Sequence, residues 1–415
     1  MYRLLNQIKL FNEHYDPLKK IYYLNKPLRI LMKRVISSEK KPIKLWTDDI
    51  DEGAMQQAKN LANLPFTFKW VAIMADCHKG YGMPIGGVLS TSGVLIPNAV
   101  GVDIGCGVCA ARTSLRSIEH NTLLKVLQAV RGRVPLGPVH HKKPRQWEGF
   151  SSAPDVAIIR QELDSARHQL GTLGGGNHFI EIQKGSDGFI WLMLHSGSRN
   201  FGLKIANEYH KKALGMVKKW HSSLPDRDLA FLPLETREAG EYLAAMNFAL
   251  DFARASRYMM VEAVKTSLQE MVAGISFSDT INVHHNYAAR EVHYGEEVIV
   301  HRKGAISAKE GETGIIPGSQ GMKSYIVRGR GNPESFMSCS HGAGRKMGRR
   351  QAIRSLSLKD ERKFLDDRGI IHSVRSARDL EEAAGAYKDI NIVMENQKDL
   401  VESLVELSPL AVIKG

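Results

Sequence analysis

Short apolar runs separated by glycine-rich turns dominate the chain from Lys44 onward, and this pattern restricts the fold more than any other feature. FKWVAIM (68–74) is typical of a strand and is followed by the loop DCHKGYGMPIGG (76–87). FIWLMLH (189–195) has the continuous apolar character of a buried strand. Three further segments are predicted to form strands and turns: 93–110, 296–307 and 321–329.

Helices are interleaved with these strands, but the regular βαβ rhythm of a doubly wound sheet is missing. Apolar spacing predicts a long helix over 237–271, which contains no Pro and only one Gly, Gly240. Shorter helices are predicted over 119–133, 155–170, 357–368 and 378–404. Without an internal repeat or a low-complexity linker, the chain is expected to form one large α+β domain.

Length and charge restrict the function classes. The 415 residues allow two or three domains, or one large one, at roughly 100–200 residues per domain. The net charge of +13 favours polyanionic partners such as nucleic acid, nucleotides or an anionic membrane, although a basic enzyme without a polymer partner is equally compatible with it. No apolar run approaches the ~20 residues of a membrane span and the N-terminus lacks signal-peptide features, so a cytoplasmic location is expected.

The first 40 residues differ from the rest, because they are basic, carry several Tyr and have weak apolar periodicity. Met32 is followed by a segment that resembles an ordinary start. We therefore predict a basic extension over 1–40, in which 1–31 reflect a misassigned start or form an arm that contacts RNA, and a catalytic domain over 41–415.

Polar residues with metal-binding potential follow or end several predicted strands, where loops usually display functional groups. They are Asp76, His78, Asp103, Cys106, Asn177, His178, His195, His284, His285 and His341. A thiolate can bridge two divalent ions while imidazoles and a carboxylate complete the ligand shells. A single His is more often structural, but several in glycine-flanked loops favour ligands. Ligand softness alone would favour zinc over manganese.

Two glycine-rich segments, 316–324 and 340–345, offer backbone N–H groups and basic side chains suited to a nucleotide phosphate. Neither matches the P-loop or GxGxxG, and a turn without a ligand is the commoner explanation for either segment alone. His341 lies in the second segment, where its imidazole could attack a nucleoside triphosphate and form a phosphoramidate.

Ten motifs occur in a fixed order along the chain: MADCHKGYGMPIGG, VGVDIGCG, LGGGNHFIE, LHSGSR, HHNY, RKGA, IPGSQG, CSHGAGR, AYKDI and the terminal KG. Together they resemble the RtcB family of GTP- and manganese-dependent RNA ligases, from about Lys41 to Gly415. The resemblance implies a single RtcB-like domain with mixed β-sheets surrounded by helices and glycine-rich active-site loops. It also implies the joining of RNA ends that carry a 2′,3′-cyclic phosphate or 3′-phosphate to ends that carry a 5′-hydroxyl.

The resemblance also implies roles for individual residues. His341 would be guanylylated by GTP, and Asp76 would orient or deprotonate the attacking 5′-hydroxyl. Cys106 would bridge two Mn²⁺ ions, with Asp103, His195 and His285 in one shell and His178 in the other. The GTP or GMP contacts would be Asn177, Phe179, Glu181, Asn286, Pro317, Gly318, Ser319, Gly342, Ala343, Gly344, Tyr387 and Lys414. The residues that face RNA or phosphate would be Arg199, Lys303, Arg328 and Arg345.

Departures from the family pattern leave alternatives open. Ala75 and Cys77 stand where better-studied members have Pro and Val, and Cys77 is either a small buried apolar residue or a redox-sensitive thiol. A related nucleotidyl transferase would guanylylate 3′-phosphate ends of RNA or DNA without efficient joining. A non-catalytic RNA-binding protein would retain the ligands as a structural metal site. The family further suggests an archease-type activator as a partner.

Overall fold

The computed structural model describes residues 32–220 and 223–415. Residues 1–31, on which the predicted N-terminal extension mainly falls, lie outside the described residues. Within the described part, β1 (Arg34–Ile36) pairs with β2 (Ile43–Leu45), so residues 34–36 join a sheet. The prediction that the domain begins at residue 41 stays untested.

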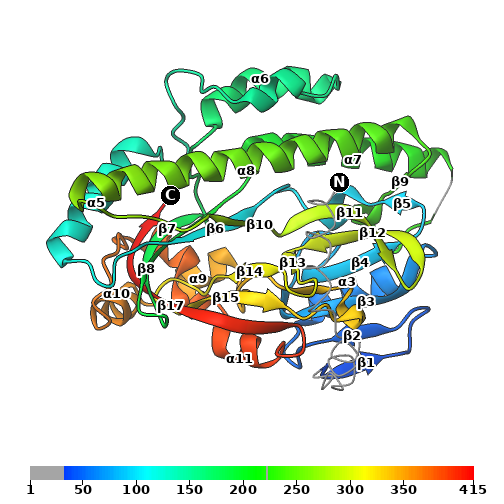
Figure 1. The fold of residues 1–415 in the computed structure, drawn as a ribbon. Coiled ribbons are helices and arrows are strands. Elements are labelled where there is room, and N and C mark those ends of the chain that lie inside the picture. The colour runs from blue at the N-terminus through cyan, green and yellow to red at the C-terminus, as the bar shows by residue number, and fades with distance from the viewer. Residues whose placement is uncertain (1–31, 221–222) are drawn as a thin grey trace, which may run out of the picture. The chain divides into compact units, whose positions relative to one another are not determined.

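Two large sheets carry the fold (Figure 1). Among the described residues, the six-stranded sheet has the order β1-β2-β3-β4-β12-β11, and the seven-stranded sheet has the order β10-β6-β8-β7-β17-β15-β14. The remaining strands of the first sheet are β3 (Thr67–His78), β4 (Ile85–Thr91), β12 (Glu296–Lys303) and β11 (Asn286–His293). The strands of the second are β10 (Ile281–His284), β6 (Gly107–Arg112), β8 (Ile190–Ser196), β7 (Phe179–Gly185), β17 (Val401–Lys414), β15 (Ser324–Gly329) and β14 (Thr313–Ile316). Two small two-stranded sheets consist of β13 (Ala305–Ser307) with β16 (Ser338–Ser340) and β5 (Val94–Leu95) with β9 (Leu232–Pro233).

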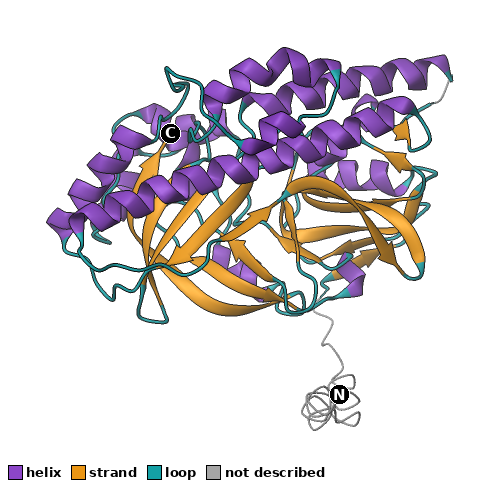
Figure 2. Cartoon of the chain, turned by 45° about the horizontal axis from the view of Figure 1, so that its top comes forward, coloured by secondary structure: helices purple, strands orange, loops and turns teal. Residues whose placement is uncertain are grey.

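The long helices gather on one side of these sheets (Figure 2). α8 (Arg237–Met271) packs against β6, β8 and β10 and also against α5 (His120–Arg133) and α7 (Asn200–Lys219). Its buried face includes Phe248 and Phe252, which join Phe201 of α7 in one aromatic cluster. The other helices are α3 (Glu52–Ala62), α4 (Pro97–Val100), α6 (Ala157–Gln169), α9 (Arg349–Ser355), α10 (Leu358–Asp366) and α11 (Ile390–Glu395). None of the described helices is both long and apolar enough to cross a membrane.

Most predicted elements are confirmed, including the α+β class and the long helix over 237–271. The helices predicted over 119–133, 155–170 and 357–368 correspond to α5, α6 and α10. The segment 93–110 is only partly strand, because α4 and a turn divide β5 from β6.

The helix predicted over 378–404 is wrong. The structure has two 3-10 turns, Ala377–Glu382 and Ala384–Ala386, then α11, and then β17 from Val401. Helix-forming residues fill the first half of this segment. Gly385 interrupts them, however, and Val401 already pairs with Gly329 of β15. The sequence interpretation also missed α7, although its buried Phe201, Ile205, Tyr209, Ala213 and Val217 have helical spacing.

Candidate metal centre and nucleotide site

Strand pairing brings together the cysteine and two of the histidines of the predicted metal set. Gly107, which follows Cys106, is paired with Ser196 of β8 on one side and with His284 of β10 on the other. The neighbours His195 and His285 are thereby held beside Cys106, and the His285 N–H donates to the Cys106 carbonyl at 2.9 Å. The register of three adjacent strands therefore places ligands that lie far apart in the sequence.

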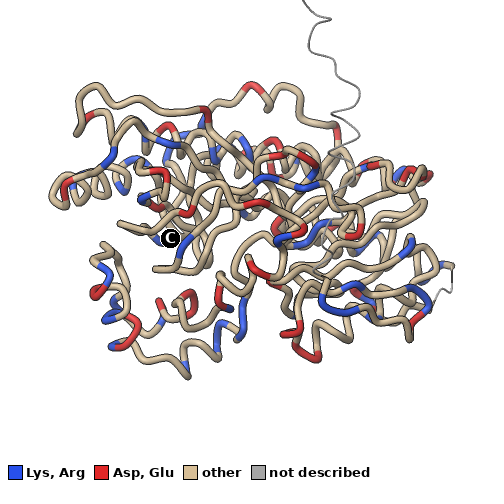
Figure 3. The backbone as a smooth tube through the Cα atoms, turned by 60° about the horizontal axis from the view of Figure 1, so that its bottom comes forward, with Lys and Arg blue, Asp and Glu red and all other residues tan. Residues whose placement is uncertain are grey.

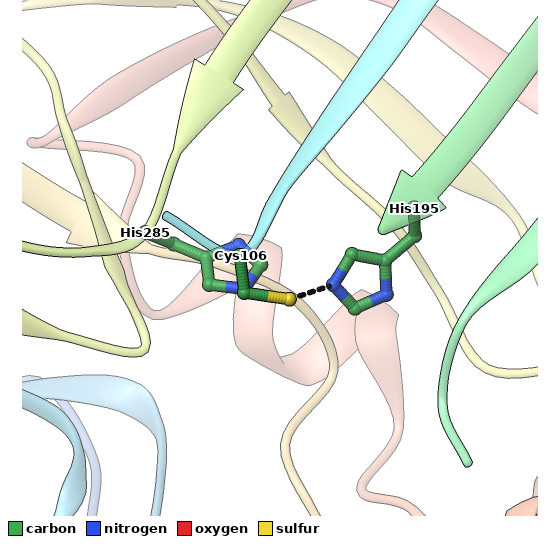
Figure 4. A group of neighbouring side chains, drawn as sticks. All are labelled: Cys106, His195 and His285. Atoms are coloured by element: carbon green, nitrogen blue, oxygen red, sulfur yellow. Dashed lines mark hydrogen bonds between the residues drawn. The ribbon is translucent and has the colours of Figure 1, made fainter. Parts of the chain in front are cut away.

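The Cys106 thiol lies at the centre of two groups of potential ligand atoms. Its Sγ is 3.2 Å from His195 Nε2 and 3.5 Å from His178 Nε2. The first group joins Cys106 with His195 and His285 (Figure 4), and the second joins Cys106 with Asp103 and His178. The resemblance instead implied that Asp103 shares a shell with His195 and His285. In the structure Asp103 Oδ2 lies 3.5 Å from His178 Nε2.

The histidines are oriented as metal ligands usually are. His178 Nδ1 lies 2.8 Å from the Leu173 carbonyl and His195 Nδ1 lies 3.2 Å from the Asn177 carbonyl. A ring N–H that donates to a backbone carbonyl leaves the opposite Nε2 free for a metal. His285 Nδ1 is buried and has no hydrogen-bond partner within the described part of the chain. This orphaned nitrogen and the thiol-imidazole-carboxylate donor set fit one or two divalent ions.

Burial also sets the protonation of this cluster. It lowers the pKa of His195 and His285 well below the ordinary value, so both rings are neutral near pH 7. Burial opposes the charge on Asp103, but its interaction with the His178 ring, 3.5 Å away, keeps its pKa below the usual value. Burial and the Asp103 carboxylate together raise the pKa of the Cys106 thiol. A divalent cation would counter both effects and stabilise the thiolate.

His341 lies next to this cluster and is held by Asp76. Its Nδ1–H donates to Asp76 Oδ2 at 2.6 Å, and its ring centroid is 4.8 Å from that of His285. The backbone N–H groups of His341 and Gly342 donate to the same oxygen at 3.0 and 3.2 Å. Burial would raise the pKa of Asp76, but its interaction with the His341 ring holds that pKa below its usual value. In the neutral ring, an Nδ1–H that donates to Asp76 leaves the lone pair on Nε2, which is the atom available for attack.

A pocket of about 1070 Å³ joins His341 and the cysteine-histidine cluster to the predicted nucleotide contacts. Its lining includes the predicted residues Asn177, Phe179, Glu181, Asn286, Pro317, Gly318, Ser319, Gly342, Ala343, Gly344, Tyr387 and Lys414. Gly344 has φ +73, and a Cβ there would meet the Asp76 carbonyl oxygen at 2.0 Å. Only glycine permits this close approach of the SHGAGR loop to β3.

Two groups suited to hydrogen bonding with a nucleobase face this pocket from neighbouring strands. Because Lys414 of β17 pairs with Phe179 of β7, its Nζ comes within 5.9 Å of the Phe179 ring centre, and Glu181 lies two residues along β7. Burial raises the pKa of Glu181 to about 7 and lowers that of Lys414. Gln183 donates to Glu181 at 2.6 Å.

Three of the four residues predicted to face RNA or phosphate donate to protein acceptors. Arg199 donates to Thr172 Oγ1 at 3.1 Å and to the Gly137 carbonyl at 3.2 Å. Lys303 Nζ donates to the Tyr81 and Asn98 carbonyls, and burial lowers its pKa to about 7. Arg345 bonds Glu382 at 3.0 Å and the Glu381 carbonyl at 2.6 Å. Arg328 is exposed on β15 and lies outside the pocket lining.

Sequence reasoning missed two charged groups of this region. Glu382 is only 3% exposed. Its carboxylate accepts hydrogen bonds from Arg345, from Arg349 at 2.9 Å and from the Tyr387 hydroxyl. Arg257 of α8 is fully buried beneath Cys106 and donates to the carbonyls of Gly105 and Ser196 at 2.7 and 2.9 Å. Arg257 could have been found from the sequence. It is a charged residue between Ala253 and Val261 on the apolar face of the long predicted helix, where a charge is unusual.

Comparisons with known proteins agree with the motifs. The family model described as tRNA-splicing ligase RtcB matches residues 57–155 and 146–415. The chain is 40% identical over 407 residues to the RNA-splicing ligase RtcB of Escherichia coli strain K12, which covers 92% of this chain and 99% of that protein. It is 32% identical over 463 residues to the tRNA-splicing ligase RtcB of Pyrobaculum aerophilum, which covers 91% and 95% respectively.

Proposed function

The chain belongs to the RtcB family of RNA-splicing ligases, and from that premise we propose that it joins RNA ends in a GTP-dependent reaction. One substrate end carries a 2′,3′-cyclic phosphate or a 3′-phosphate, and the other carries a 5′-hydroxyl. The observation that carries the proposal is the Asp76–His341 pair beside the Cys106 cluster, in a pocket that also contains Glu181 and Lys414.

The first step forms a covalent guanylyl enzyme. His341 Nε2 attacks the α-phosphorus of GTP, a P–N bond forms, and the bond to the bridging oxygen breaks so that pyrophosphate leaves with the electron pair. Asp76 holds the ring in the tautomer with Nδ1–H and stabilises the positive charge that develops on the imidazole. GMP then passes to the RNA 3′-phosphate, and the 5′-hydroxyl attacks that activated end and releases GMP.

Two Mn²⁺ ions would be held by the two groups that share Cys106, one with His195 and His285 and the other with Asp103 and His178. When bound, they would neutralise negative charge on the triphosphate and on the RNA 3′-phosphate. The chain itself keeps the imidazoles neutral by burial and keeps His178 and His195 oriented through backbone carbonyls.

Guanine specificity is assigned to the two pocket-facing groups on β7 and β17. The Glu181 carboxylate would accept from guanine N1–H and N2–H, and Lys414 would donate to O6. Adenine would leave both groups unpaired, which is a strong basis for discrimination. Phe179 and Tyr387 line the same pocket and would stack on the base.

The decisive experiment incubates the protein with Mn²⁺ and GTP labelled at the α-phosphate. We expect covalent label on wild type, no label on His341→Ala, and full label on His120→Ala, an exposed histidine of α5 that serves as a matched control. Label retained by His341→Ala, or none on wild type, would overturn the nucleophile assignment.

A second assay separates joining from end modification. A cleaved hairpin with a 3′-phosphate and a 5′-hydroxyl is incubated with GTP and Mn²⁺, and each is omitted in turn. Joined RNA is expected only when both are present, whereas capped ends without joining would identify the nucleotidyl transferase alternative. The cytoplasmic location and the need for an archease-type activator stay predictions.

A further inference from the structure

The pocket wall formed by α9 and the loop before it carries three cations that form no ion pair with the described residues. Lys346, Arg350 and Arg354 are exposed, line the pocket that holds His341, and take part in no ion pair within residues 32–220 and 223–415. Glu382, the buried carboxylate next to α9, already receives Arg345 and Arg349. The charges of Arg350 and Arg354 are therefore available to a ligand, whereas Lys346 also interacts electrostatically with Glu361.

Two of these cations lie on one face of α9. Arg350 and Arg354 are four residues apart, so they stack about 6 Å apart along α9. Arg354 Nε donates to the Arg350 carbonyl at 3.2 Å, which holds the second side chain along the helix. Lys346 extends the row toward the loop that carries His341. Such a row of cations suits consecutive phosphates of a nucleic-acid strand better than a single anion.

The surrounding charge distribution makes this row distinctive. Acidic and basic residues are interspersed along the chain rather than divided between two faces (Figure 3). The net charge of +13 therefore does not by itself select a binding face. Three of the four cations that the resemblance assigned to RNA or phosphate, Arg199, Lys303 and Arg345, are engaged inside the protein, and the fourth, Arg328, lies outside the pocket lining.

We propose that Lys346, Arg350 and Arg354 form a phosphate-binding track that guides single-stranded RNA along α9 to His341. The inference rests on the proposed function for the identity of the polyanion. The contacts are to the backbone and carry no sequence specificity. The competing source of the same chemistry is the β,γ-phosphate group of GTP, and the experiment distinguishes the two.

The test compares Arg350→Gln/Arg354→Gln with the matched pair Lys204→Gln/Lys211→Gln, which removes two exposed charges from α7 outside the pocket lining. Binding of a fluorescent oligouridylate is measured by anisotropy without GTP or Mn²⁺, from low to high salt. Loss of two phosphate contacts should reduce the magnitude of the slope of log K against log salt concentration by about 1.4. At 0.1 M salt this corresponds to a roughly 25-fold lower RNA affinity. The α7 pair should change neither quantity.

Three further measurements make the result unambiguous. Arg350→Lys/Arg354→Lys should recover most of the salt slope, and probes with a 3′-phosphate or a 3′-hydroxyl should lose affinity equally. Guanylylation by GTP without RNA should be unchanged in the α9 variant. An unchanged RNA slope overturns the proposal, and so does a defect confined to guanylylation, which would assign the track to the triphosphate. Failure of wild type to be guanylylated would instead reject the proposed function while the RNA measurement still stands.

Discussion

One carboxylate oxygen of Asp76 accepts three hydrogen bonds, and the other has no hydrogen-bond partner among the described residues. Oδ2 accepts from the His341 ring and from two backbone N–H groups, whereas Oδ1 is buried and unbonded. Gly86 keeps space beside Oδ1, because a Cβ there would meet it at 2.8 Å. An unpaired buried carboxylate oxygen costs about 1–3 kcal/mol, and a functional site is the usual reason to retain one.

We expect Asp76→Asn to slow guanylylation by at least about 10²-fold, because the amide cannot hold the Nδ1–H tautomer or stabilise the developing imidazolium charge. Single-turnover labelling by GTP without RNA measures this step. The circular dichroism spectrum should match that of wild type. Normal labelling with failed joining would instead restrict Asp76 to the 5′-hydroxyl, the other role that the family resemblance implied.

Burial of Glu181, the residue proposed to contact guanine, has a cost in stability that depends on pH. Its folded pKa is raised to about 7 from 4.5, so the folded state retains a proton that the unfolded state has lost. Stability is therefore lost as pH rises from 4.5 to 7, and the penalty is complete above 7. Glu181→Gln removes this penalty. We expect its free energy of unfolding at pH 8 to exceed that of wild type by about 1–3 kcal/mol, with a correspondingly higher Tm, and to equal that of wild type at pH 4.5.

The same variant should lose GTP affinity at pH 8, because the amide NH₂ cannot accept from guanine. In wild type, GTP affinity should fall about tenfold for each pH unit below 7, because the Glu181 carboxylate becomes protonated. Isothermal titration with GMP across this range tests both statements. A flat pH profile in wild type would mean that Glu181 does not contact the base.

Arg257 contacts the backbone and side-chain atoms next to three of the proposed metal ligands. Its guanidinium contacts Gly105, Ser196 and His284, which are the sequence neighbours of Cys106, His195 and His285. Supporting residues of this kind typically contribute 10–100-fold to metal affinity. We expect Arg257→Lys to weaken Co²⁺ binding by that factor, as followed by the thiolate-to-cobalt absorption band. Unchanged cobalt affinity in a folded variant would make Arg257 a packing residue only.

At the scale of elements, periodicity predicted the long helix α8 but missed α7 and placed a helix wrongly over 378–404. The stripe of α8 extends over 35 residues and was read correctly, because each buried turn repeats the same signal. The helix predicted over 378–404 extended into residues 401–404 of β17, because the Leu and Glu content there resembles helix composition and the pairing partners β7 and β15 are remote in sequence. Strand pairing is a long-range property that composition does not report.

β17 ends with the group proposed to read guanine O6, and this gives a test of the strand register. Lys414→Met removes one charged donor at a strand end that stays paired with Phe179. Preference for GTP over ATP in the labelling reaction should fall about 10–100-fold, with no change in Tm beyond that of the exposed control Lys359→Met. An unaltered preference would assign guanine recognition to other residues.

At the scale of the whole molecule, the sequence predicted which residues lie close together but not how they are grouped. The ordered motifs singled out Asp103, Cys106, His178, His195 and His285, and the structure brings them together. Their grouping depends on how the loops before β6 and β7 fold, and these loops place Asp103 beside His178. Cys77, another open question, is fully buried, and burial raises the pKa of its thiol to about 12, which supports the apolar interpretation.

Because these ligands come from four separate segments, a bound metal should stabilise the folded chain as a whole. A ligand at 100 times its Kd adds about 2.7 kcal/mol to folding. We expect chelation to lower Tm, Mn²⁺ to restore it, and Cys106→Ser to be nearly insensitive to both, since Cys106 belongs to both groups. At equal concentration Zn²⁺ should raise Tm more than Mn²⁺, following ligand softness, even if Mn²⁺ alone supports guanylylation. Equal responses in Cys106→Ser and wild type would show that the stabilising metal binds elsewhere.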